Sequence, residues 1–112
     1  MTLIYKTISV GSIAAGATSE NSWTSDDAYT LKYIIAVEAT DATLSNVTAT
    51  LRIDDFTFTK DSIPLSIFQR PVNQLLELNY DLSKGKTFYY SITNNTSSSV
   101  TISLVLVLEK AE

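Results

Sequence analysis

The chain has 112 residues and a mass of 12.3 kDa, which predicts one domain, residues 1–112, with a single hydrophobic core. Its formal net charge is -4, and it contains neither cysteine nor histidine. These absences exclude a Ser-His-Asp or Cys-His nucleophile, thiolate and imidazole metal sites and an imidazole proton shuttle. An acidic chain without a basic run is a poor binder of nucleic acid. We therefore expect no enzymatic activity, no metal or other cofactor and no nucleic-acid partner.

The N-terminal sequence indicates a protein that is not exported. Residues 1–6 lack the charged start and the apolar stretch of roughly 7–15 residues that are typical of a signal peptide. The longest apolar stretch, 100–108, is too short to span a bilayer. We expect synthesis in a cytoplasm and no membrane span. The alternative is a mature or excised piece of an extracellular protein.

Apolar and polar residues alternate along most of the chain, which indicates β-strands with one wet face. A first strand begins near Ile4 and ends at Gly11, and a polar edge strand around Trp23 follows within 18–25. A long strand is predicted over 29–39. Its buried face is predicted to comprise Tyr29, Leu31, Tyr33, Ile35, Val37 and Ala39.

The middle of the chain predicts a hairpin followed by an irregular crossing. Apolar residues alternate with Thr and Arg over 47–53, and Asp54-Asp55 forms a tight turn into a strand over 56–59. The apolar segment 63–68 contains Pro64, which confines it to an edge, a strand start or an irregular crossing.

Segment 74–80 is ambiguous. Pro71 before it suits a first helical turn, whereas Leu76, Leu78 and Tyr80 alternate as in a strand, and we favour the strand. A second hairpin follows, with strands over 87–93 and 100–108. About eight short strands predict an all-β fold: a single antiparallel β-sandwich, although a small closed barrel would alternate in the same way.

The order of these features resembles a known class of proteins. A Thr-alternating strand ends in Ile53-Asp54-Asp55, and a crossing around Ile63-Pro64-Leu65 leads to the segment 81–87. A strand ending in Ile92-Thr93-Asn94-Asn95 then precedes a long apolar last strand, and 8–18 forms an opening strand with a small-residue loop. Together they resemble the small single jelly-roll sandwiches of bacterial and archaeal virus particles: capsid, penton-base, spike and decoration subunits.

This resemblance implies a jelly-roll-like sandwich that resides in the virion. It also implies a subunit without catalytic residues, which works through self-assembly or through attachment to other capsid proteins.

Apolar residues on both faces of two strands predict a subunit interface. The outward phase of the last strand starts with hydroxyl-bearing residues but continues as Val105 and Val107, and Ile34 and Ala36 occupy the exposed phase of the long strand. Apolar residues on both faces indicate burial on both faces. We therefore expect a homo-oligomer with these four residues at the contact. The alternative is that the N-terminal segment or the segment 11–18 folds over them.

Three aromatic residues predict a possible carbohydrate contact. Trp23, Tyr5 and Tyr89 lie out of phase with their strands or among polar neighbours, and exposed aromatics could form a sugar-stacking platform. The structural alternative is that Trp23 caps one end of the sandwich. A carbohydrate-binding module is the alternative function, and a secreted filament or surface-layer subunit is the third.

Six aspartates at predicted turns could supply a glycosidase pair, and the adjacent ones could hold calcium: Asp26, Asp27, Asp54, Asp55, Asp61 and Asp81. Asp26-Asp27 and Asp54-Asp55 both lie at predicted turns, where Asp bonds to nearby backbone, and neither pair has the alternating spacing of a dedicated calcium loop. We expect them to be structural.

Overall fold

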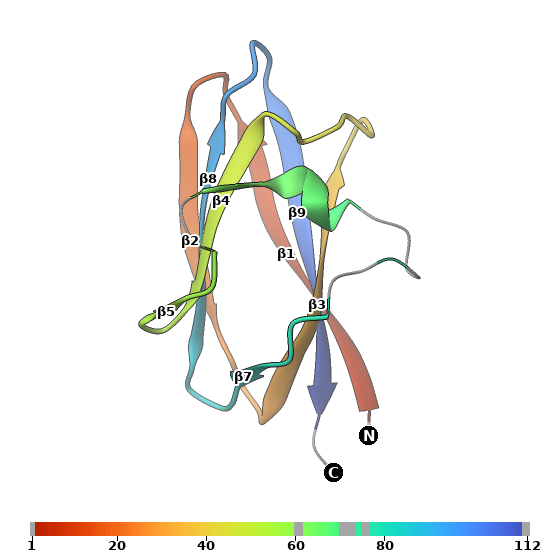
Figure 1. Ribbon diagram of the computed structural model, residues 1–112, viewed down its shortest axis with the longest axis vertical. Coiled ribbons are helices and arrows are strands. Elements are labelled where there is room, and N and C mark those ends of the chain that lie inside the picture. Colours follow the sequence, from red (N-terminus) through yellow and green to blue (C-terminus); the bar gives the residue numbers. More distant parts are fainter. Residues whose placement is uncertain (1, 60–61, 70–73, 75–76, 111–112) are drawn as a thin grey trace.

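The computed structural model describes residues 2–59, 62–69, 74 and 77–110. Within these ranges the chain forms nine β-strands and one short 3-10 helix (Figure 1). In chain order they are β1 (Thr2–Ile13), β2 (Thr18–Thr24), β3 (Tyr29–Glu38), β4 (Val47–Ile53), β5 (Phe56–Thr57), β6 (Ile63–Pro64), η1 (Leu65–Phe68), β7 (Tyr80–Leu82), β8 (Thr87–Asn94) and β9 (Val100–Lys110).

The strands form two antiparallel sheets that pack face to face. Sheet A has the order β1-β9-β3-β7, and sheet B has the order β2-β8-β4-β5, with β6 also pairing with β4. Early strands pair with late ones: β1 with β9, β2 with β8 and β3 with β7. The chain is thus one long double strand rolled into two layers, which is the jelly-roll arrangement. The prediction of an all-β, jelly-roll-like sandwich is confirmed.

The core lies between the two sheets and is built from alternate residues of each strand. In β4 every second residue from Val47 to Ile53 is buried, while the Thr and Arg between them are partly exposed. The same alternation holds along β8 and the first half of β9. Burying one aliphatic or aromatic side chain contributes about 1.5–3 kcal/mol. The largest fully buried side chains include Leu31, Ile34, Leu51, Leu82, Phe88, Ile92, Ile102, Leu104 and Leu106.

The predicted turn at Asp54-Asp55 is confirmed. Ile53 pairs with Phe56, so β4 and β5 are connected by Asp54 and Asp55 alone. The backbone N–H of Asp54 donates to the carbonyl of Thr87 at 2.9 Å, and its carboxylate accepts from the N–H of Thr87 at 3.0 Å. The turn is therefore attached to the start of β8. The strand predicted over 56–59 is shorter than expected, since β5 covers two residues only.

The first strand does not end at Gly11 as predicted. A β-bulge lies between Ser9 and Gly11, after which β1 continues to Ile13 in register with β9. Gly11 has a φ of 88°, a conformation that glycine adopts without strain. Glycine therefore supplies the bulge that lets the strand continue, rather than a strand end.

A second bulge overturns the faces assigned to the long strand. In β3 the register with β9 shifts between Leu31 and Tyr33, so Lys32 is an extra residue. The alternation reverses there: Leu31 is buried, but the next core residues are Ile34 and Ala36. The prediction that Tyr33, Ile35, Val37 and Ala39 share the buried face is therefore wrong.

The crossing between the sheets is irregular, as Pro64 indicated. Ile63–Pro64 is a two-residue strand against β4, and η1 follows with Leu65 and Phe68 buried. No helix among the described residues is long and apolar enough to cross a membrane. The favoured strand over 74–80 is not formed, because the residues described just before Tyr80, 77–79, lie outside any strand. Residues 61, 71, 75 and 76 lie outside the described residues.

Candidate functional site

The outer face of sheet A carries a contiguous set of apolar side chains, which we call the apolar face. The registers place Tyr5 and Tyr33 on either side of Val107, and Thr7 and Ile35 on either side of Val105. Further residues extend the set at its two ends. The apolar face consists of Leu3, Tyr5, Tyr33, Ile35, Val37, Val105 and Val107.

Exposure is uneven across the apolar face. Tyr5 is 64% exposed, and Leu3 and Val37 are also among the most exposed large apolar residues of the described chain. Val107 is only 3% exposed although it points away from the core, because its strand neighbours Tyr5 and Tyr33 flank it. The face is therefore a packed apolar surface in which two tyrosine rings flank Val107.

The four residues predicted at an interface do not lie together. Val105 and Val107 belong to the outer face of sheet A, in the phase that the sequence indicated. Ile34 and Ala36 are 1% and 5% exposed and belong to the core, so their assignment to an interface is wrong. The physical reason is the bulge at Lys32, which moves Tyr33, Ile35 and Val37 to the outside.

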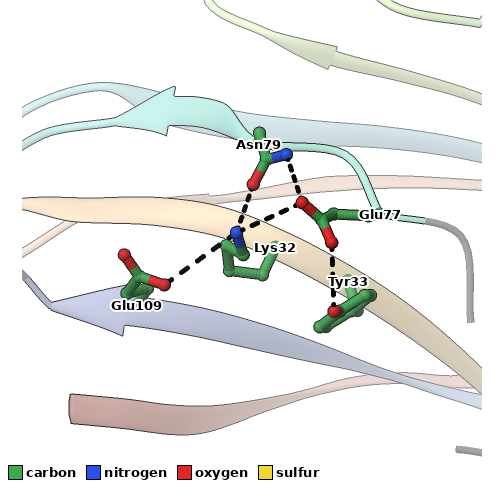
Figure 2. A network of polar contacts seen from close by, with 5 residues as sticks. All are labelled: Lys32, Tyr33, Glu77, Asn79 and Glu109. Atoms are coloured by element: carbon green, nitrogen blue, oxygen red, sulfur yellow. Dashed lines mark hydrogen bonds and ion pairs between the residues drawn. The ribbon is translucent and has the colours of Figure 1, made fainter. Parts of the chain in front are cut away.

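Charged and polar residues border the apolar face where β3, β7 and β9 run together (Figure 2). The ammonium of Lys32, the extra residue of the bulge, lies 3.5 Å from Glu77 and 3.9 Å from Glu109, and it donates to the side-chain oxygen of Asn79. The hydroxyl of Tyr33 donates to Glu77 at 3.4 Å. These contacts join an aromatic ring of the apolar face to a group of one ammonium and two carboxylates.

The contacts at this border favour the ionised form of Glu77. A hydrogen bond from the Asn79 amide, together with the nearby charge of Lys32, holds the pKa of Glu77 below its usual value. The segment before β7 is also tied down through its backbone, since the N–H of Leu78 donates to the carbonyl of Lys32 at 2.8 Å.

The three aromatics predicted as ligand contacts lie in three different places. Tyr5 is on the apolar face of sheet A, whereas Tyr89 is on the outer face of sheet B. Trp23 pairs with Phe88 and packs against the core, with Tyr29 stacked at 6.3 Å and the Lys6 ammonium 5.7 Å from its ring. A single platform containing all three is not formed, and Trp23 closes the space between β1 and β2.

The outer face of sheet B is polar and hollowed. A hollow of about 340 Å³ lies over β2, β8 and β4. The side chains that line it include Glu20, Ser22, Tyr89, Ser91, Thr50 and Arg52. The Arg52 guanidinium lies over the ring of Tyr89, with its central carbon 3.7 Å from the ring centroid. This face thus contrasts with the apolar face on the opposite side of the sandwich.

A smaller hollow of about 270 Å³ lies between β5 and β7 and was not anticipated from the sequence. Phe56 and Tyr80 line it, edge to face at 5.3 Å, and an ion pair of 3.3 Å between Lys86 and Asp81 borders it. Phe56 sits next to the Asp54-Asp55 turn and is exposed. An aromatic residue directly after a tight turn was the one signal that could have drawn attention to it.

The paired aspartates have structural partners. The carboxylate of Asp27 and the ammonium of Lys110 form an ion pair at 2.8 Å. This pair joins the loop before β3 to the end of β9. Asp54 holds the start of β8, as described above. The hydrogen bond from Lys110 lowers the pKa of Asp27.

No protein-family model matches the chain, and no curated protein matches it either.

Proposed function

We propose that the protein is a non-enzymatic structural subunit of a virus particle, and that it assembles with further copies of itself through the apolar face. The observation that carries the proposal is the contiguous apolar surface on the outside of sheet A, centred on Val105 and Val107. Exposed contiguous apolar surface marks interaction sites. The likeness to single jelly-roll subunits of virus particles supports the virion as the place of assembly.

The distribution of charge makes the apolar face the place where a second copy is repelled least. The chain has a net charge of -4, so two copies repel each other over most of their surfaces. The two rows of the apolar face around Val107 and Val105 contain no charged side chain. At the border, Lys32 lies between Glu77 and Glu109 and offsets the charge of one of them. Two copies can therefore meet over the uncharged rows, while the border of each copy keeps one net negative charge.

The dimensions of the face suit the centre of an interface. Three strands about 4.8 Å apart and six residues rising about 3.3 Å each give a surface of roughly 20 by 14 Å. That is less than the roughly 800 Å² per partner of a standard interface, so the contact must extend into the surrounding residues. Interfaces have an apolar core rich in aromatic residues and a polar rim. Tyr5 and Tyr33 fit the core, and the Lys32 group fits the rim.

Sedimentation velocity over a range of concentrations tests the assembly. The wild type should sediment as a species larger than 12.3 kDa at high concentration. Tyr5→Asp and Val105→Asp should both dissociate it, because a carboxylate would be buried without a partner. Thr57→Asp, at an exposed residue of β5, is the control and should assemble as the wild type does. A wild type that stays monomeric at every concentration would contradict the proposal.

The genomic neighbourhood tests the virion assignment separately. A gene for this chain beside capsid and genome-packaging genes is the expected result. A location among genes for polysaccharide breakdown or for secretion would instead favour a binding module or an exported filament.

A further inference from the structure

The outer face of sheet B carries a hollow that lies outside the proposed assembly surface on sheet A. The hollow has a volume of about 340 Å³, at the lower end of the range of roughly 300–1,000 Å³ for small-ligand sites. Its residues come from three adjacent strands, β2, β8 and β4, so a rigid sheet fixes their spacing. Sites built on sheet strands hold their geometry better than sites built on loops.

Arg52 is a cation for which the described residues provide no acidic partner. No ion pair joins it to Glu20 or to any other acid in the part of the chain that the structure describes. Its guanidinium is instead held by stacking on Tyr89 and by donation to the backbone carbonyl of Asp54. Two contacts therefore orient a planar group with five N–H donors, only one of which is used by this bond.

The rest of the hollow suits a ligand rich in hydroxyl groups. Glu20 supplies a carboxylate that already accepts a bond of 3.3 Å from Ser91, and Ser22 and Thr50 supply further hydroxyls. Among the residues that the structure describes, no aliphatic side chain lines the hollow. Its polar side chains offer a sugar hydrogen-bond donors and acceptors at the spacing of a sheet.

We propose that this hollow binds an acidic saccharide, with the sugar carboxylate held by Arg52 and the ring hydroxyls held by Glu20 and the neighbouring Ser and Thr residues. The guanidinium fork matches a carboxylate and can donate two parallel hydrogen bonds to it. Stacking on Tyr89 limits the freedom that the guanidinium loses on binding. The hollow and the apolar face belong to opposite sheets, so saccharide binding and assembly are independent.

Calorimetric titration of the purified full chain tests the proposal with two pairs of probes. Trigalacturonic acid is compared with its methyl ester, and sialyllactose is compared with lactose, so that each pair differs in its carboxylate. At least one of the two acids should bind. The affinity of its neutral counterpart should be lower by about tenfold or more, as expected when a charged hydrogen bond is lost.

Variants assign the binding to Arg52. Arg52→Gln should lower the affinity for the acid by about tenfold or more, and Arg52→Lys should not restore it, because an ammonium lacks the fork. Lys84→Gln removes a cation from an exposed turn and should leave the affinity unchanged. Circular dichroism should show that each variant is folded as the wild type is.

Three results would overturn the proposal: neither acid binds, Arg52→Gln binds as the wild type does, or triglutamate binds as tightly as the sugar acid. The last result would indicate a general site for peptide carboxylates. Val105→Asp should keep the wild-type affinity, so a failure of the assembly proposal would be recognised separately.

Discussion

The carboxylate of Glu38 accepts a hydrogen bond of 3.0 Å from the backbone N–H of Thr101, which ties the end of β3 to β9. Its other oxygen accepts from the backbone N–H groups of Thr40 at 2.6 Å and Ala42 at 3.2 Å. The hydrogen bond from the Thr40 hydroxyl, followed by that from the Thr101 N–H, lowers the pKa of Glu38 from 4.5 to about 2. One side chain therefore fixes the loop after β3.

Stability should consequently fall in acid through Glu38. Since its pKa is lowered in the folded state, the stabilisation is complete above about pH 4.5 and is lost as the pH falls towards 2. Urea unfolding measured between pH 4.5 and pH 2 should show that Glu38→Gln loses less unfolding free energy than the wild type does. Between pH 8 and pH 6 the free energy of unfolding of both proteins should stay constant, because the chain has no histidine. Parallel curves below pH 4.5 would contradict the role given to Glu38.

Asn94 should be required for the turn between β8 and β9. Its side-chain amide, fully buried, donates to the carbonyls of Ile13 and Ser98 at 3.0 and 2.7 Å, and its oxygen accepts from Thr96. Asn94→Ala should cost about 1–3 kcal/mol in the free energy of unfolding, the usual cost of leaving buried groups unsatisfied. Asn94→Asp should cost more, since a carboxylate cannot donate to either carbonyl. Asn95→Ala, at the exposed neighbour, serves as the control for urea denaturation.

The bulge at Lys32 predicts opposite effects at two nearby positions. Ile34→Ala should cost about 2–5 kcal/mol, because it empties a buried site. Val37→Ala should change the unfolding free energy by no more than roughly 0.5 kcal/mol, because Val37 is exposed. Thermal and urea unfolding at low protein concentration would measure both without interference from association. The reverse order would mean that the strand continues without a bulge.

Two leucines test the packing between the sheets. Leu51→Ala in β4 and Leu104→Ala in β9 should each cost about 2–5 kcal/mol, out of a total stability of about 5–15 kcal/mol for a domain of this size. Their outward neighbours Thr50 and Ser103 should accept alanine within roughly 0.5 kcal/mol. If the outward changes were as damaging as the leucine changes, the faces of both strands would be reversed.

Strands with unbroken alternation could be predicted from the sequence, and β4, β8 and β9 lie where it indicated. The faces of β3 could not, because residues 33–37 are Tyr-Ile-Ile-Ala-Val and suit either side of a sheet. Only the register with β9, which introduces the bulge, decides between them. The pairing of β7 with β3 is also not visible in the local sequence pattern. For this reason the alternation over 74–80 predicts a strand that begins before β7.

The candidate sites were visible only in part. The phase of β9 identified Val105 and Val107, but their neighbours Tyr5 and Tyr33 depend on pairing across most of the chain. The hollow of sheet B could not be predicted, because Glu20, Arg52 and Tyr89 come together only when three distant strands align. In the sequence Arg52 is merely the polar residue of an alternating strand.

The position of β9 between β1 and β3 also sets the order of events during synthesis. Residues 2–13 and 29–38 are made first, yet each receives its main partner only when residues 100–110 have left the ribosome. Pairing over such separations is slow, and strands waiting with unpaired edges are prone to aggregate. Sheet A must therefore form late, and a chain stalled before residue 100 would present two apolar strands without the one that joins them.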